Sequence, residues 1–225
     1  MGGDPTDEAS HAGCIDEWGL AVWSPSASVG LITGHQLDRR RGRVGYWWCL
    51  ARRGHRLLYV ADWEVRARPS DGLAKGEQLW AEMLCEAPLS QWTIGNETNA
   101  VALDDPDDVV MGARGEPTPV ACDLEWYAVG SRPVAVDDGY VHDGVVHGAI
   151  EIAGEPSLAI VEWPARRWHR WWSDSDIRWS PAPLPTAMAY ADGRAPVLGP
   201  SGMVIEYVLT PTGWAVRLPL TDDVE

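Results

Sequence analysis

Apolar and polar residues alternate with a period of two through residues 78–127, and this alternation constrains the fold more than any other feature of the chain. Successive side chains of a β-strand point to opposite faces, so the alternation predicts strands that each bury one face. The predicted apolar face of the last run consists of Val120, Cys122, Leu124 and Trp126. An Ala-Pro pair at 87–88 and an acidic loop at 104–108 separate the runs. We therefore expect these strands at the centre of a β-barrel or a strongly curved sheet.

The rest of the chain carries the same kind of pattern and has almost no helical periodicity. The segments predicted as further strands are 17–23, 27–35, 44–52, 55–65, 145–153, 157–163, 177–179, 186–190, 203–209 and 213–218. At most two short helices are expected. The dense basic run at 39–43 lies between two of these strands, and we interpret it as a solvated hairpin turn. The chain is thus predicted to be all-β.

Several short stretches of this region form a pattern that a known group of proteins shares. They are Cys-Glu-Ala-Pro-Leu at 85–89, Trp92, Ala-Val-Ala-Leu-Asp-Asp-Pro at 100–106 and Asp-Leu-Glu-Trp at 123–126. The pattern resembles the lipocalin-like superfamily that includes carotenoid 1,2-hydratases (hydroxyneurosporene synthases), AttH-type proteins and fungal decalin-forming Diels–Alderases. The resemblance covers residues 60–172 and implies two tandem lipocalin-like β-barrel or curved-sheet halves with an apolar cavity.

This resemblance suggests a division of the chain into three parts. Residues 1–14 are expected to be a flexible tail, residues 15–135 an N-terminal lipocalin-like β domain, and residues 136–225 a smaller C-terminal β domain. The junction is expected within 130–140, where Ser-Arg-Pro and Asp-Asp-Gly interrupt the strand pattern. A chain of 225 residues is long enough to bury a substantial core.

Composition narrows the range of partners. The net charge of −15 argues against a nucleic-acid or anionic-membrane partner, because binding phosphate groups needs a basic surface. The chain has 14 Trp and 6 Tyr but no Phe, so many large rings must either fill the core or line a pocket with mixed polarity. The apolar cavity that the resemblance implies makes a hydrophobic small molecule the expected partner. The oligomeric state is left open.

Metal, cofactor and targeting signals are weak. The four cysteines show no CxxC spacing, and His142 and His147 are five residues apart with Asp143 as the one acidic residue between them. No dinucleotide fingerprint, Walker loop or Gly-x-Ser-x-Gly elbow occurs, so neither a metal nor a cofactor is expected. The polar, acidic start of the sequence lacks the features of a signal peptide, and no segment is long and apolar enough to span a membrane. A cytoplasmic location is therefore expected.

The densest group of chemically active residues lies at 162–172. In the related family the second half begins with a segment that reads roughly Arg-Asp-His-Ser-Trp-Gly and faces the cavity. Arg167, His169 and Trp171 match the Arg, His and Trp positions, and the resemblance implies that they face a cavity here. Trp168 stands at the position of the Asp, so a carotenoid hydratase that protonates an alkene with that acid is not implied.

Other carboxylates could supply a proton. Alkene protonation needs a desolvated acid with a raised pKa, and the candidates on strand patterns are Glu162, Asp123, Glu125, Glu97 and Asp62. Glu162 is preferred because Leu158 and Ile160 are expected on the same face. The predicted catalytic residues are Glu162, His169 and Asp123, and the predicted substrate-binding residues are Trp92, Trp126, Arg167, Trp171 and Glu97.

Each of these residues also has a structural interpretation. Glu162 could form an ion pair with Arg166 or Arg167, and His169, interpreted as a general base or orienting donor, could instead be a histidine hydrogen-bonded at the junction of the halves. Asp123 would be solvated if its face lies outside the barrel. Trp92 and Trp126 could belong to the core or to a cavity wall.

Three hypotheses about function follow. The first is a cofactor-independent enzyme that cyclises, hydrates or isomerises a large terpenoid or polyene in a Trp-lined cavity, by an acid–cation route or by a pericyclic route. The second is a non-catalytic binding or carrier protein for hydrophobic metabolites. The third is a structural protein whose cavity is filled by the bulky Trp168 and Trp172.

Overall fold

The computed structural model describes residues 8–173, except 27, 53, 71, 105–113, 131 and 137, together with the backbone of three strands nearer the C-terminus. These ranges contain strands and no α-helix, so the predicted all-β class is confirmed for them. The strands are β1 (Ile15–Trp23), β2 (Val29–Asp38), β3 (Arg43–Arg52), β4 (Leu58–Arg66), β5 (Leu73–Lys75), β6 (Leu79–Ala87), β7 (Gln91–Leu103), β8 (Gly115–Ala128), β9 (Val134–Val136), β10 (Gly139–Ile152), β11 (Leu158–Trp172), β12 (Arg194–Leu198), β13 (Val204–Thr210) and β14 (Gly213–Arg217).

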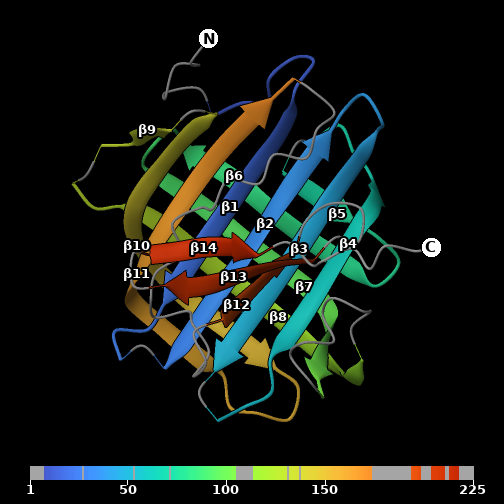
Figure 1. Ribbon diagram of the computed structural model, residues 1–225, viewed down its shortest axis with the longest axis vertical. Coiled ribbons are helices and arrows are strands. Elements are labelled where there is room, and N and C mark those ends of the chain that lie inside the picture. Colours follow the sequence, from blue (N-terminus) through green and yellow to red (C-terminus); the bar gives the residue numbers. More distant parts are fainter. Residues whose placement is uncertain are drawn as a thin grey trace.

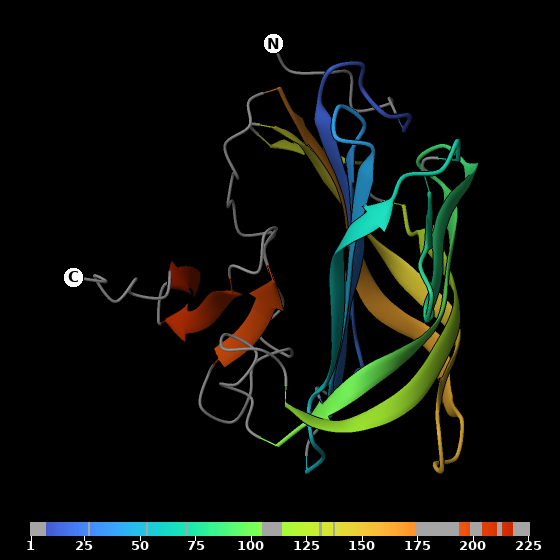
Figure 2. The ribbon, with the colours of Figure 1, turned by 90° about the vertical axis from the view of Figure 1, so that its right-hand side faces the viewer.

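One antiparallel sheet contains most of these strands and partly closes into a ring. Its order is β4-β3-β2-β1-β11-β10-β8-β7-β6-β5, and β4 also pairs with β7. The closing contact is short, because it joins only Leu58 to Ala102 and Tyr59 to Val101. Figure 2 shows β1–β4 on one side and β5–β8 on the other, with β10 and β11 crossing between them.

The ring does not follow the predicted division into two tandem halves. Strands β10 and β11 lie within the predicted C-terminal domain, yet β10 pairs with β8 and β11 pairs with β1, which both belong to the predicted N-terminal domain. Within residues 8–173 the chain therefore forms one ring rather than two. The remaining strands, β12–β14, form a separate three-stranded sheet, which lies over the outer face of β1–β3 in Figures 1 and 2.

The period-two pattern correctly predicts which strand faces are buried. In β8 the apolar set that ends at Trp126 is buried, whereas Asp123 and Glu125 between its members are exposed. In β7 the alternation buries Trp92, Ile94 and Asn96 in the same way. Cys122, on the predicted apolar face of β8, is a buried free thiol, whereas Cys85 near the end of β6 is exposed.

In the half of the ring formed by β3, β2, β1, β11 and β10, residues that are paired directly across neighbouring strands form rows of interior side chains. One row runs across β3, β2, β1, β11 and β10 and consists of Tyr46, His35, Trp18, His169 and Tyr140. The next row contains Thr33 and Leu20 beside Arg167 and His142. All of these side chains are buried, so polar groups are concentrated in the interior of this half.

Several tryptophans pack on glycines of neighbouring strands. A Cβ atom added to Gly34 would lie 2.3 Å from the ring of Trp47, and one added to Gly19 would lie 2.0 Å from the ring of Trp168. The pairs Gly45 with Trp63, Gly144 with Trp126, and Gly95 with Trp80 repeat this arrangement. Glycine leaves room for a flat ring over the backbone, so the high Trp content serves strand packing to a large extent.

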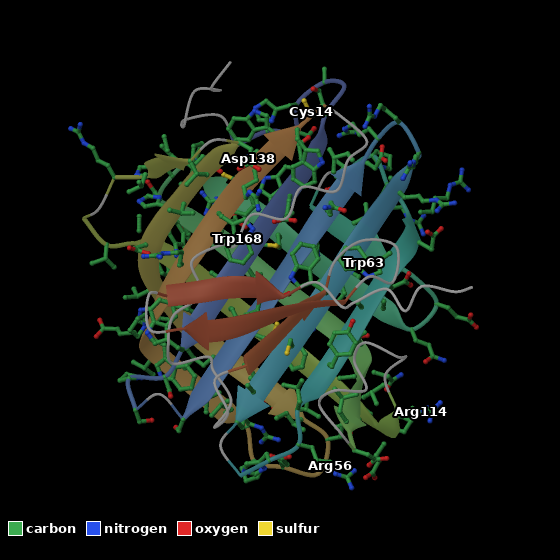
Figure 3. The ribbon with its side chains drawn as sticks, in the orientation of Figure 1. Cys14, Arg56, Trp63, Arg114, Asp138 and Trp168 are labelled. Carbon is green, nitrogen blue, oxygen red and sulfur yellow. The ribbon has the colours of Figure 1, made fainter. Side chains whose placement is uncertain are left out.

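The outer face of β1–β3 is buried as well. Trp47 and Trp168 lie on this side, with only 4% and 3% of their surface exposed. Figure 3 labels Trp168 on the left and Trp63 on the right of the central part of the view. Trp168 and Trp172 therefore do not fill the interior of the ring, which removes the reason given for the third hypothesis.

The N-terminal segment differs from the predicted flexible tail in its described part. Residues 8–14 lie against the ring, and the side chain of Glu8 is only 6% exposed. The basic run at 39–43 does form the hairpin turn between β2 and β3, where Asp38 interacts with Arg40 and Arg41. The predicted strands at 177–179 and 186–190 lie outside the described residues. No helix that could span a membrane occurs in the part of the chain that the structure describes.

Candidate functional site

A buried arginine lies at the centre of the most polar part of the interior. Arg167 of β11 has no exposed surface, and its guanidinium group lies 4.4 Å from the ring centre of Trp92, 5.1 Å from that of Trp126 and 5.4 Å from that of Tyr140. Aromatic faces attract cations, and the attraction is strongest where water is excluded. We call Arg167, these three rings and Glu8 the arginine cluster.

Glu8 supplies the negative charge of the arginine cluster from outside the ring. Arg167 donates hydrogen bonds from Nη2 to Oε1 of Glu8 at 2.6 Å and from Nη1 to Oε2 at 3.1 Å. Tyr140 also donates to Glu8, and Arg167 donates to the hydroxyl of Tyr140 at 2.9 Å. The backbone N–H of Leu89 donates to Oε1 at 2.9 Å. Trp92 also donates from Nε1 to Oε1 at 3.4 Å. The carboxylate therefore accepts hydrogen bonds from β7, β10, β11 and the turn before β7.

Burial and charge act in opposite directions on Glu8. Burial alone raises its pKa, but the charge of Arg167 and the hydrogen bonds from Tyr140 and Leu89 outweigh it, so the pKa is lowered. Burial raises the pKa of Tyr140. The cluster therefore contains a carboxylate and a neutral phenol at neutral pH. The Nε atom of Arg167 has no hydrogen-bond partner among the described residues.

A second polar group lies where β1 begins and β11 ends, next to the N-terminal segment. Nε2 of His169 lies 3.1 Å from Oδ1 of Asp16, and Nδ1 of His11 lies 2.7 Å from the same oxygen. His169 and Asp16 are almost completely buried, whereas the side chain of His11 is 16% exposed. Burial lowers the pKa of His169, although Asp16 opposes this effect, so the imidazole is neutral at neutral pH.

A third polar group connects the two sides of the ring. Asn96 of β7 donates a hydrogen bond to the hydroxyl of Tyr46 on β3 at 2.7 Å, and the ring of His35 meets Tyr46 edge to face at 5.4 Å. Neither ring nitrogen of His35 has a hydrogen-bond partner among the described residues, and the same holds for Oδ1 of Asn96. Burial lowers the pKa of His35 to about 3.

A fourth group lies on the outer side of β11. Arg170 donates hydrogen bonds to Asp138, and Trp168 donates from Nε1 to Glu17 at 2.9 Å. Figure 3 labels Asp138, which precedes β10, and Cys14, which precedes β1, in the same upper part of the view. Because Arg170 and Trp168 point away from the ring interior, this group stabilises the contact of β1 with β11 and takes no part in the interior site.

Glu162, the preferred catalytic acid, does not lie in the interior. The expected face shared with Ile160 is interrupted, because Glu162 adopts a left-handed backbone conformation with φ of 53° and is exposed. The alternative ion pairs of Glu162 are not formed either, since Arg166 binds Asp143 and Arg167 binds Glu8. A strand bulge cannot be recognised from alternation, and it reverses the side on which each following residue lies.

Two further predicted residues lie on the outside of the ring. Asp123 of β8 and Glu97 of β7 are both exposed and point away from the buried face of their strands. Asp123 therefore has the solvated environment of the structural interpretation. Neither residue has the desolvated surroundings that a proton donor to an alkene requires.

The structure brings together the predicted residues of β11 and the two predicted tryptophans. Arg167, His169 and Trp171 share one face of β11, because they alternate along a regular strand. Trp92 and Trp126 are paired across β7 and β8 and both contact Arg167 through their rings. Trp171 is farther away and stacks on His11, with ring centres 4.0 Å apart.

Sequence reasoning missed Glu8, His11 and Asp16. Asp16 shares the face of β1 that carries Trp18 and Leu20, so period-two alternation could have placed it inside. Glu8 and His11 belong to no strand and follow no periodic pattern, which leaves no sequence signal for their position. His142 and His147 lie on opposite sides of the sheet: His142 packs inside against Trp126, and His147 meets Tyr127 on the outside.

Comparisons with known proteins add no family to this picture. No protein-family model matches the chain, and no protein with a curated description matches it significantly. The resemblance to the lipocalin-like superfamily therefore stays a prediction.

Proposed function

We propose that the protein binds a small amphipathic molecule with a carboxylate group, and that Arg167 holds the carboxylate at the end of the ring interior. The observation that supports this most is the composition of the arginine cluster: a fully buried guanidinium that is neutralised by a carboxylate from outside the ring. This is the non-catalytic alternative among the hypotheses, with a specific head group added.

The physical argument starts from the cost of burying a charge. A buried guanidinium without an anion is strongly unfavourable, so the cluster needs a carboxylate in place at all times. A guanidinium group binds a carboxylate through two parallel hydrogen bonds, which is the geometry that Glu8 adopts on Arg167. A ligand carboxylate would meet the same donors, including Tyr140.

The surroundings suit the apolar part of such a ligand. The rings of Trp92 and Trp126 flank the arginine, and the interior beyond them is formed by one continuous apolar cluster. His35 and Asn96 add buried polar atoms that lack partners among the described residues. A ligand with one polar group some distance from its carboxylate would complement both positions.

The test is a fluorescence titration with cis-parinaric acid and its methyl ester. In the wild type Glu8 already occupies Arg167, so the titration uses the variant Glu8→Gln. This variant is expected to bind the acid at least about tenfold more tightly than the ester, since a charge-assisted pair contributes roughly 1.5–3 kcal/mol. The double variant Glu8→Gln/Arg167→Met removes both charges and should lose this preference. Glu8→Gln/Arg166→Met, which changes an arginine on the outer side of the same strand, is the matched control and should keep the preference.

Two results would contradict the proposal. Glu8→Gln protein could bind acid and ester equally, which would show that no cation recognises the head group. Alternatively, the double variant could retain the preference for the acid, and the recognising cation would then lie elsewhere.

Catalysis on a hydrophobic substrate is the second candidate, and one observation favours it. The buried Asp16–His169 pair lies on the same face of β11 as Arg167, so a neutral imidazole held by a carboxylate is close to the proposed ligand. A cofactor-independent cyclisation or isomerisation of a terpenoid or polyene would use His169 as base or donor in place of Glu162 or Asp123.

Incubation with isoprenoid diphosphates, polyenes and sterols, followed by mass spectrometry, tests this candidate. A product formed by wild-type protein and lost in His169→Asn, while the affinity for cis-parinaric acid is kept, would support it. A product formed equally by both proteins would exclude a role for His169.

A further inference from the structure

Three side chains that commonly bind metal ions meet at the end of the ring where β1 begins and β11 ends. The possible ligand atoms of His11, Asp16 and His169 all lie within 4.8 Å of one another. Both imidazole nitrogens approach the same carboxylate oxygen, Oδ1 of Asp16, at 2.7 and 3.1 Å. Four-coordinate ligands about 2.1 Å from a zinc ion would be about 3.4 Å apart, so only small movements separate this arrangement from a coordination sphere.

The fold holds all three side chains in place from different directions. Asp16 lies on β1. The backbone N–H of His11 donates to both of its carboxylate oxygens, with N···O distances of 3.1 Å to Oδ1 and 3.0 Å to Oδ2. The ring of His169 stacks on Trp18 at 4.6 Å, and the ring of His11 stacks on Trp171 at 4.0 Å. Because packing fixes both imidazole planes, a bound ion would find its ligands already oriented.

We propose that His11, Asp16 and His169 form a binding site for a divalent transition-metal ion, with Zn²⁺ as the best fit. Two imidazoles and one carboxylate are a ligand set that Zn²⁺ binds well, and three protein ligands leave one position for water or a bound molecule. The partly exposed ring of His11 gives an ion a route to the buried Asp16 and His169.

Binding would replace the present hydrogen bonds by metal bonds. A carboxylate can only accept, so the ring nitrogens that face Asp16 now carry protons. When the ion binds, these protons move to the other ring nitrogen or to solvent, and the lone pairs of Nδ1 of His11 and Nε2 of His169 then face the ion. No change of oxidation state is involved.

The site would also connect the N-terminal segment to the ring. Glu8 and His11 belong to the same short segment, which contacts the ring at Arg167 and at Asp16. If the proposed function is correct, an ion on His11 would hold Glu8 on Arg167 and weaken the binding of an acidic ligand. This consequence rests on the proposed function, whereas the metal site itself does not.

Calorimetric titration of the chelator-treated full chain with Zn²⁺ tests the site. The wild-type protein is expected to bind one equivalent, and His11→Gln is expected to bind about tenfold or more weakly, because one of three ligands is lost. His11 is partly exposed, so this variant should retain the circular dichroism spectrum of the wild type. Cys14→Ser, close to the site, and His55→Gln, on an exposed turn, are controls that should bind normally.

Co²⁺ absorption gives a second readout, since bands from nitrogen and oxygen ligands differ from those of a thiolate. No Zn²⁺ binding by the wild type, equal affinity in His11→Gln, or loss of binding in Cys14→Ser would each overturn the site. A further titration of wild-type protein with cis-parinaric acid, with and without Zn²⁺, tests only the connection to Glu8. Its failure alongside normal Zn²⁺ binding would leave the metal site intact.

Discussion

At the scale of single residues, buried polar groups distinguish this protein from a simple apolar barrel. Arg167 is neutralised by Glu8, His169 is held by Asp16, and His35 has no partner for either ring nitrogen among the described residues. Buried polar atoms without partners are uncommon in folded proteins and call for a physical explanation. The pH dependence of stability at His35 also measures the free-energy cost of placing a positive charge in this interior.

The pKa of His35 predicts a specific loss of stability in acid. In the folded protein burial lowers this pKa from 6.5 to about 3, so between these values the unfolded chain binds a proton that the folded chain does not. The free energy of unfolding should therefore fall as the pH drops below about 6.5, by roughly 2–3 kcal/mol at pH 4.5 from this residue alone.

Urea unfolding of wild type and His35→Phe between pH 7 and pH 4 measures this effect. The variant should lose less stability over this range, and the difference between the two curves should grow as the pH falls. His55→Gln, which removes an exposed histidine, should follow the wild type. Parallel curves for His35→Phe and wild type would show that His35 is not buried as described.

At the scale of elements, tryptophan–glycine pairs set how closely neighbouring strands pack. Gly34 of β2 lies under the ring of Trp47 and also against the backbone oxygen of Trp18, which a Cβ atom would approach to 2.6 Å. A side-chain ring can shift, but a backbone oxygen within a ladder of paired strands cannot shift without breaking the ladder. Any side chain at this position should therefore be costly.

Gly34→Ala should lower the free energy of unfolding by about 1–3 kcal/mol or more, as expected for overpacking. The matched control is Gly76→Ala, where the nearest atoms to a Cβ would be at 3.6 and 3.8 Å and the change should stay within about 0.5 kcal/mol. Chemical denaturation monitored by tryptophan fluorescence compares the two. Equal effects at both positions would contradict this account of strand packing.

The alternation of residues predicts much of the element-scale structure and fails where the backbone is irregular. It correctly places Trp92 and Trp126 inside and leaves Asp123 outside, because regular strands obey a period of two. It misplaces Glu162, because a residue with a positive φ breaks the alternation within β11. Glu8 could not be placed at all, since its position depends on contacts with distant strands.

At the scale of the whole molecule, strands far apart in sequence complete one ring. The first strand, β1, pairs with β11, and the ring is closed by the short contact of β4 with β7. The resemblance implies two tandem halves, and their junction is predicted at 130–140 because Ser-Arg-Pro and Asp-Asp-Gly interrupt the strand pattern there. Pairing between distant strands is decided by tertiary packing, which local composition does not reveal.

The N-terminal segment gives this ring an internal competitor for the proposed ligand. Glu8 occupies the position on Arg167 that a ligand carboxylate would take, and its segment approaches from outside the ring. An acidic ligand must therefore displace Glu8, so the strength of the Glu8–Arg167 pair limits the affinity for that ligand.

The affinity of Glu8→Gln for cis-parinaric acid tests this central claim most directly. Removing the competing charge leaves Arg167 without an anion, so the variant should bind the acid at least about tenfold more tightly than wild type, while its affinity for the methyl ester stays unchanged. Equal or weaker binding of the acid by Glu8→Gln would contradict the claim that Glu8 and an acidic ligand compete for Arg167.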